Sequence, residues 1–168
     1  MPAVVGTAFP WAAVALFAIA AIRDLTRRRI DNALVGAVLL VWAAAVATAG
    51  GVPQGATVTG HLLAATAGFA LFFPLYLLGS MGGGDVKMAA AVLLWAGPDR
   101  VLPTIALIGV AGMGLAILML LLHPLVTRHP AAVPLSLLDK GRGVPYGVAL
   151  SIGGAYAAIA WVLPAPGT

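Results

Sequence analysis

Five acidic residues, all aspartates, are the groups in this sequence with the most chemical potential. Asp99 stands next to Arg100 and Asp139 next to Lys140, so we expect each of these two acids to form a solvated ion pair in a loop. The other three acids border long apolar runs, where an ionisable side chain normally has a function. They are Asp24, Asp31 and Asp85.

Two carboxyl groups within hydrogen-bonding distance cannot both ionise cheaply, so a pair of them holds one proton over a wide pH range. This state suits peptide hydrolysis. The ionised carboxylate takes a proton from an attacking water, while the protonated one donates to the peptide oxygen. Asp24 and Asp85 are the candidates for such a pair, because both are expected near the same face of the membrane.

The stretch "MGGGDVKMAA", residues 81–90, surrounds one member of this pair. Gly82, Gly83 and Gly84 lack Cβ atoms, so they allow a sharp turn and the close approach of a helix or an extended peptide. If Asp85 starts a helix, the helix dipole favours its charged form and the role of base. The pattern also fits an ordinary glycine turn with a capping aspartate, and Asp24 among arginines also fits a helix-end ion pair.

The composition is that of an integral membrane protein. The chain has 168 residues, of which 62% are hydrophobic and 8% charged, and its mean hydropathy is +1.07. No hydrophilic block is long enough for a second domain, so we expect residues 1–168 to form one membrane-embedded domain. No basic stripe alternates with exposed aromatic residues, so we expect no nucleic-acid partner despite the pI near 10.1. The chain has no cysteine, which excludes disulfides and cysteine-ligated zinc.

Six apolar runs predict an all-α protein with six transmembrane helices. Most runs approach the roughly 20 residues that cross a bilayer. Helices are expected because an open strand edge cannot satisfy its polar groups in lipid. The runs cover about residues 7–22, 33–52, 61–79, 86–97, 101–122 and 144–163.

The basic residues predict the orientation. If all six runs cross and the N-terminus lies outside, eight basic residues are cytoplasmic and only Arg100 is outside, as the positive-inside rule requires. The main alternative has the fourth run re-entering the membrane, which lowers the ratio to six against three. From Met88 to Pro98 that run would extend only about 17 Å as a helix, so either the bilayer thins or the helix begins below the surface. In the second case Asp85 would lie inside the cytoplasmic leaflet. The connection over 124–143 is expected to be a mobile cytoplasmic segment.

Three stretches, in this order, resemble the type IV prepilin peptidases, the GxGD class of aspartic membrane proteases. The closest likeness is to the short form associated with Flp (tight-adherence) pili. The stretches are "DLTRRRIDN" from Asp24 to Asn32, "GGGDVKMAAAVLLWAG" from Gly82 to Gly97, and "VPYGVALSIGG" from Val144 to Gly154. The second contains the Gly-x-Gly-Asp-x-Lys signature as Gly82, Gly84, Asp85 and Lys87.

The resemblance implies that Asp24 and Asp85 are the catalytic pair. It also implies a location in the bacterial inner membrane and a prepilin substrate, whose basic leader is cut at the cytoplasmic face just before a hydrophobic helix. The reaction would need no covalent intermediate, metal or other cofactor. The longer members of the family add a cytoplasmic domain with paired cysteines and methylate the mature pilin. This chain has neither the cysteines nor the room, so we expect a protease without methyltransferase activity.

One departure from the family pattern adds a third carboxylate near the pair. Asp31 replaces a proline, giving "IDN" in place of "IPN". We favour Asp31 as the N-cap of the second helix, with substrate contact as the alternative. Asn32, Pro145 and Gly147 share this open choice between a structural role and substrate contact.

Lys87 and Tyr146 also have two interpretations. Lys87 would tune the pair or contact substrate, or else snorkel to the surface and set the topology. Tyr146 would hydrogen-bond near the pair or else anchor the interface. His61, His123 and His129 are far apart in sequence, and we expect no metal site from them.

Two other classes of protein compete with the protease. A small proton-coupled transporter would also need paired acids, but near the bilayer midplane and accessible from both sides. A non-enzymatic assembly subunit of a pilus or secretion machine would need the membrane helices without the hydrolysis.

Overall fold

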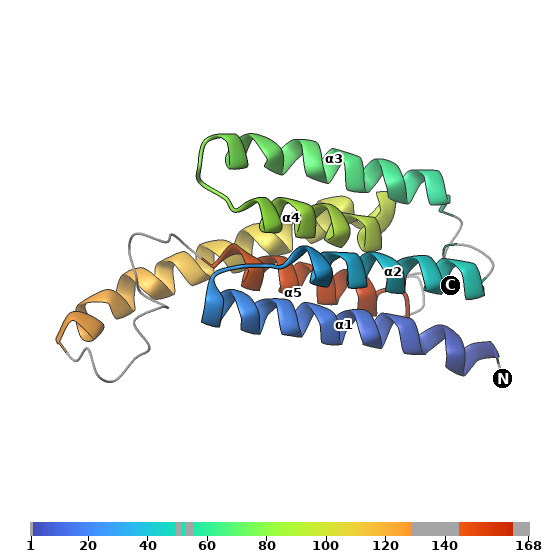
Figure 1. Ribbon diagram of the computed structural model, residues 1–168, viewed down its shortest axis with the longest axis horizontal. Coiled ribbons are helices and arrows are strands. Elements are labelled where there is room, and N and C mark those ends of the chain that lie inside the picture. The colour runs from blue at the N-terminus through green and yellow to red at the C-terminus, as the bar shows by residue number, and fades with distance from the viewer. Residues whose placement is uncertain (1, 50–51, 53–55, 129–144, 163–168) are drawn as a thin grey trace.

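The computed structural model describes residues 2–49, 52, 56–128 and 145–162, and these form a bundle of helices. The described residues contain no strand, in agreement with the predicted all-α class. Figure 1 shows the helices lying roughly parallel or antiparallel along one long axis. In chain order they are α1 (Pro2–Arg27), α2 (Asn32–Ala49), α3 (Val58–Leu77), α4 (Gly83–Arg128) and α5 (Tyr146–Ile159).

Helix α4 consists of two helices that meet at a kink. Gly97 has φ 64° and ψ 177°, which is not helical and which favours glycine because it has no Cβ. In Figure 1 the chain reverses there, and the second half of α4 runs back past the first. Pro98 lies against the first turn of α3, since a Cβ on Gly60 would be 3.1 Å from the proline Cγ.

The kink leaves backbone carbonyls without their usual helical donors. The carbonyl of Leu94 would normally accept from residue 98, but Pro98 has no N–H. His61 Nδ1 lies 2.6 Å from the Leu94 oxygen, so the tautomer with a proton on Nδ1 donates to it. Trp161 Nε1 likewise donates to the Trp95 oxygen at 2.8 Å. Side chains from α3 and from the turn after α5 therefore satisfy this end of the first half of α4.

The end of α3 determines where α4 begins. Gly79 has φ 71°, and its N–H donates to the Tyr76 oxygen, while the N–H of Ser80 donates to the Leu75 oxygen. These two bonds form a Schellman motif, which ends a helix with a glycine in the left-handed region. The sharp turn expected at residues 82–84 thus occurs slightly earlier, and the left-handed glycine of the turn is Gly79.

Helix α5 occupies the middle of the bundle, in contact with both α1 and α4. Small residues allow these close contacts, as is usual where lipid removes the hydrophobic force between helices. A Cβ on Gly154 would be 2.5 Å from Phe17 Cε1, and a Cβ on Gly153 would be 2.5 Å from Ile108 Cγ1. Phe17 and Trp95 are fully buried, so the core is dense around α5.

The helices have the length and composition of a membrane protein. Among the described residues, three helices are long and apolar enough to cross a membrane: Ala8–Arg27, Val58–Leu77 and Gly83–Leu122. Two shorter helices are also apolar: Asn32–Thr48 and Tyr146–Ile159. Because the third long helix is kinked at Gly97, the described residues contain six helical segments, and the prediction that all six cross a membrane stays a prediction. Of the connection expected over 124–143, residues 124–128 are helical, contrary to the prediction, and the rest lies outside the described residues.

We predict that His61→Leu lowers the free energy of unfolding by about 1–3 kcal/mol, because it leaves the buried Leu94 carbonyl without a donor. Thermal unfolding in detergent measures the change. Leu62→Ala is the control, since Leu62 is 52% exposed on the same helix. If His61→Leu were no less stable than the control, the imidazole would not support the kink.

Candidate active site

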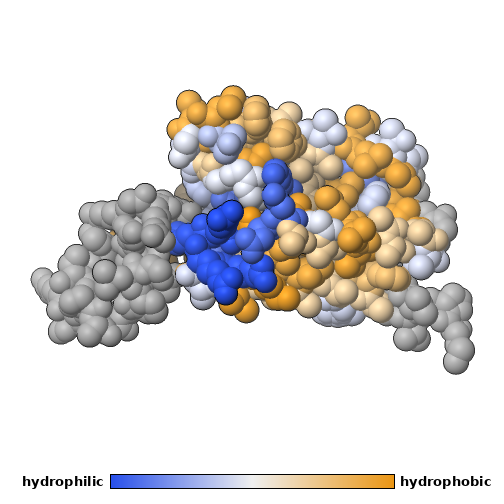
Figure 2. Space-filling model, viewed as in Figure 1, coloured by the Kyte–Doolittle hydropathy of each residue, from blue (hydrophilic) through white to orange (hydrophobic). Residues whose placement is uncertain are grey.

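Polar residues of four helices meet at one end of the bundle. This end, at the left of Figure 1, holds the last turn of α1 and the first turns of α2, α4 and α5. Figure 2 shows hydrophilic residues gathered into a patch there, with mostly apolar surface over the rest of the visible bundle. Asp24, Asp31 and Asp85 all lie at this end, whereas Asp99 and Arg100 follow the kink at Gly97 near the opposite end.

Asp24 points from α1 to the beginning of α5. Its Oδ2 accepts a hydrogen bond of 2.8 Å from the backbone N–H of Gly147, and its side chain is only 5% exposed. Gly147 is the second residue of α5, whose Pro145 N-cap has no side-chain bond of its own. The carboxylate therefore caps α5 from another helix, and the positive end of the helix dipole stabilises its negative charge.

Gly147 is required by this contact. A Cβ at that position would lie 2.7 Å from Asp24 Cβ and 2.8 Å from its Cγ, which is closer than real Cβ contacts. Ser151 Oγ donates to the Gly147 oxygen at 2.6 Å within α5. The sequence pointed to Gly147 only through the resemblance and suggested Tyr146 as the hydrogen-bonding residue, so the backbone donor was missed.

Asp85 lies in the first turn of α4, two residues after the helix begins at Gly83. Its Oδ2 accepts from the backbone N–H of Gly82 at 3.2 Å, and the Gly82 oxygen accepts from the Asp85 N–H at 3.0 Å. The first bond is one half of a capping box, from the side chain at N3 back to the N-cap Gly82, and the second is a backbone turn, because Gly82 has no side chain. The prediction that Asp85 begins a helix is right to within one turn. The side chain is half-buried.

Both carboxyl groups line the same cavity. Its volume is about 320 Å³, and its walls are Asp24, Arg27, Arg28, Ser80, Gly82, Asp85 and Tyr146. Two carboxyl groups in one small cavity repel each other when both are ionised. The structure therefore brings together the two aspartates that sequence reasoning paired, although 60 residues separate them. Arg27, Arg28 and Ser80 complete the walls and were not predicted as site residues.

Gly84 allows the connection between α1 and α2 to reach the first turn of α4. A Cβ on Gly84 would collide with the backbone oxygen of Ile30. Arg28, with φ 52°, ends α1 in the left-handed region and turns the chain toward this contact. We expected the glycines to make room for a helix or a substrate, and at Gly84 the neighbour is this connection.

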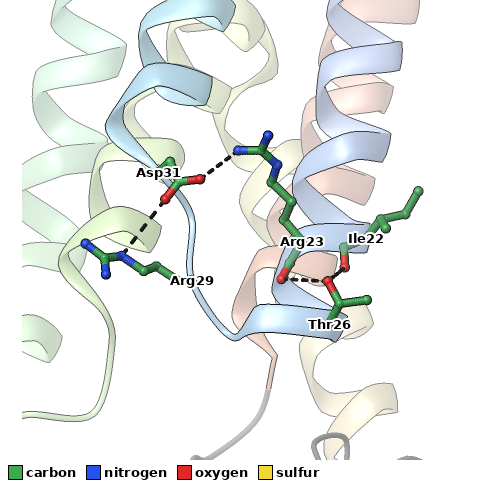
Figure 3. Close-up of polar contacts among 5 residues, drawn as sticks. All are labelled: Ile22, Arg23, Thr26, Arg29 and Asp31. Carbon is green, nitrogen blue, oxygen red and sulfur yellow. Dashed lines mark hydrogen bonds and ion pairs between the residues drawn. The ribbon is translucent and has the colours of Figure 1, made fainter.

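Asp31 belongs to a small ion-pair cluster beside the cavity. Its Oδ2 is 2.6 Å from Arg23 Nη1, and its Oδ1 is 4.0 Å from Arg29 Nε (Figure 3). Its backbone oxygen accepts from the N–H groups of Leu34 and Val35, so the residue occupies the N-cap position of α2. Asp31 thus stands at the expected N-cap position, but its side chain pairs with Arg23 and Arg29 instead of the N–H groups of α2.

Lys87 and Asn32 form a hydrogen bond between α4 and α2. Lys87 Nζ donates to Asn32 Oδ1 at 3.0 Å, in an exposed position. A second polar cavity of about 320 Å³ lies here, with Asp31, Asn32 and Lys87 in its walls. Asp85 and Arg28 line both polar cavities, so this cavity adjoins the one that contains the two aspartates.

Among the described residues, no three histidine or acidic side chains cluster as a metal site would require. His61, one of the three histidines considered above, is buried at the kink of α4 instead. His129 lies outside the described residues.

A model of the type IV leader peptidase family matches residues 4–119, more than half of the chain. The chain belongs to the type IV leader peptidase family. It is therefore a type IV leader peptidase-like protease, and membership implies a peptidase with a prepilin substrate. The match includes Asp24 and Asp85 but ends before Gly147, whose importance rests on its contact with Asp24. A search of curated proteins and one of solved structures found no match.

We predict that Gly147→Ala reduces precursor cleavage by about 100-fold, because the new methyl group displaces the Asp24 carboxyl group. Gel analysis of a co-expressed precursor measures the loss. Gly36→Ala is the matched control, since a Cβ there meets nothing within 4 Å, and it should cleave at the wild-type rate. Normal cleavage by Gly147→Ala would show that the position of Asp24 does not depend on α5.

Proposed function

We propose that this chain is an intramembrane aspartic endopeptidase that removes the basic leader from Flp-like type IV prepilins. One observation carries the proposal: Asp24 and Asp85, from α1 and α4, line one cavity at the polar end of the bundle. Family membership supplies the peptidase activity, and the paired carboxyl groups supply the chemistry. Residues 1–168 would act as one membrane-embedded domain without a cofactor.

The hydrogen bonds favour Asp24 as the base. The Asp24 carboxylate accepts a hydrogen bond of 2.8 Å from the Gly147 N–H, whereas the bond from the Gly82 N–H to Asp85 is 3.2 Å long. The donor to Asp24 also belongs to a different helix, α5. Donors fixed in this way stabilise a negative charge. Asp85 then holds the shared proton, which reverses the assignment expected from the sequence.

Hydrolysis would follow from these roles. Asp24 takes a proton from water as the water oxygen attacks the peptide carbonyl carbon, and Asp85 donates its proton to the carbonyl oxygen. When the C–N bond breaks, the leaving nitrogen takes the proton from Asp24 and a hydroxyl of the tetrahedral intermediate returns a proton to Asp85. The leader keeps a new carboxyl group, and the pair again holds one proton. The peptide bond and one water are consumed, and no covalent enzyme intermediate forms.

We place this site at the cytoplasmic face of the bacterial inner membrane. The described basic residues Arg23, Lys87 and those from Arg27 to Arg29 lie at the polar end, whereas Arg100 lies near the other end. Six crossings with the N-terminus outside would put the polar end in the cytoplasm. The first half of α4 is roughly 20 Å long at 1.5 Å per residue, so Asp85 would sit below the surface.

The position of the acids favours a protease over a transporter. A proton-coupled carrier needs ionisable groups near the middle of the membrane. Here Asp24, Asp31 and Asp85 lie together at one end, and Asp99 follows the kink near the other. Substrate contact by Asp31 is less favoured, because Arg23 already holds its carboxylate.

We predict that Asp24→Asn and Asp85→Asn each reduce precursor cleavage by about 10²–10⁴-fold, because each removes one half of the acid–base pair. A candidate prepilin is co-expressed with each variant and its mobility compared on a gel. Asp99→Asn is the matched control, an exposed acid beyond the kink. Cleavage at the wild-type rate by Asp24→Asn or Asp85→Asn would refute the catalytic pair. Intact precursor processing together with a loss of pilus assembly would favour a non-enzymatic assembly subunit.

A further inference from the structure

A large apolar groove opens beside the cavity that contains the two aspartates. Its volume is about 540 Å³, and it lies between α3 and the second half of α4. Leu71 and Leu75 form part of one wall, and Ile105, Gly109 and Met113 form part of the other. Tyr146 lines both the groove and the cavity, so the two spaces meet at this side chain.

The groove has the dimensions of a helix face. The residues that α4 contributes run from Ile105 to Ala116 at intervals of three and four, which places them on one side of the helix. Twelve positions at 1.5 Å each span roughly 17 Å. This length suits three turns of a helical peptide.

Gly109 leaves room for a helix backbone to approach the groove closely. A Cβ at this position would meet nothing within 4 Å, so packing inside the chain does not account for the absence of a side chain. Small residues on a lipid-facing helix allow another helix backbone to come near. By contrast, Gly153 and Gly154 on α5 are explained by the side chains that already fill their space.

The three spaces lie next to one another in an order that changes from apolar to polar. The apolar groove meets the cavity at Tyr146, and the cavity adjoins the second polar cavity at Asp85 and Arg28. A peptide lying along these spaces would place apolar residues in the groove and polar residues beside Asn32 and Lys87. The bond between those two parts would lie at the aspartates.

We propose that the groove between α3 and the second half of α4 binds an apolar helical segment of the substrate, which begins next to the bond that is cut. The inference rests on the proposed function, since it assigns the groove to the same substrate. Gly109 and Met113 are then specificity-determining residues, and Tyr146 positions the junction between the helix and the scissile bond.

Photocrosslinking tests the position of the helix directly. Benzoylphenylalanine replaces Met113 in the Asp24→Asn background, and the protein is reconstituted in vesicles of phosphatidylethanolamine and phosphatidylglycerol with the uncleaved precursor. We expect an adduct with the precursor's apolar segment. The matched control carries the same group at Leu118, which is 50% exposed on the same helix outside the groove, and should give at least about tenfold less adduct.

Filling the groove tests its use during cleavage. Gly109→Leu should cleave the precursor about tenfold or more slowly, while Gly114→Leu, also open at its Cβ but outside the groove, should retain the wild-type rate. Both variants should reach equal levels in the membrane, and the Gly114→Leu control should fold and crosslink like the wild type. These results would exclude misfolding as the cause of slower cleavage by Gly109→Leu.

The outcomes separate this inference from the proposed function. Adducts with lipid or a second copy of the chain alone, or equal precursor adducts at positions 113 and 118, would overturn the groove assignment while cleavage by the wild type continued. Unchanged cleavage by Gly109→Leu would overturn it as well. Cleavage of the precursor by the Asp24→Asn variant at the wild-type rate would instead contradict the proposed function.

Discussion

The hydrogen bond between Gly147 and Asp24 is the interaction on which the rest of the site depends. It fixes a carboxylate of α1 against the beginning of α5 and leaves no space for a side chain at residue 147. This one hydrogen bond therefore links the packing of α1 against α5 to the position of the proposed catalytic carboxylate. A helix start in a membrane has unsatisfied N–H groups, and a buried carboxylate needs donors, so each satisfies the other.

The same rule explains the opposite end of the molecule. At the kink the freed carbonyls of Leu94 and Trp95 accept from His61 and Trp161. These bonds connect the first half of α4 to α3 and to the turn after α5. The first half of α4 places Asp85 at the polar end, and the second half forms a wall of the apolar groove. The kink therefore contributes to the position of Asp85 and to the groove.

Much of this arrangement is predictable from the sequence, because hydropathy and charge determine the helices and their common polar end. The break near Gly97, the convergence of Asp24 with Asp85 and the position of Asp31 were all anticipated. The donor from Gly147 was not, because backbone contacts between distant helices leave no periodic pattern. The need for a donor at the Leu94 carbonyl, which His61 supplies, could have been read from the sequence. Pro98 stands four residues after Leu94 and has no N–H to donate to this carbonyl.

Why the Asp31 side chain pairs with Arg23 was also beyond sequence reasoning, because the geometry of the short connection decides which arginine reaches it. The pair is about 40% exposed on both sides, so it adds little stability. The Asp31 side chain nevertheless adds a carboxylate to the wall of the second polar cavity.

The central claim is that Asp24 and Asp85 act as one catalytic unit. A kinetic double-mutant cycle tests it most directly, with kcat/KM for the purified wild type, the two Asp→Asn variants and the combined variant. Residues that act together are not additive, so the combined variant should be no slower than the slower single variant, to within about threefold. Losses that multiply in the combined variant would show two independent groups and contradict the account.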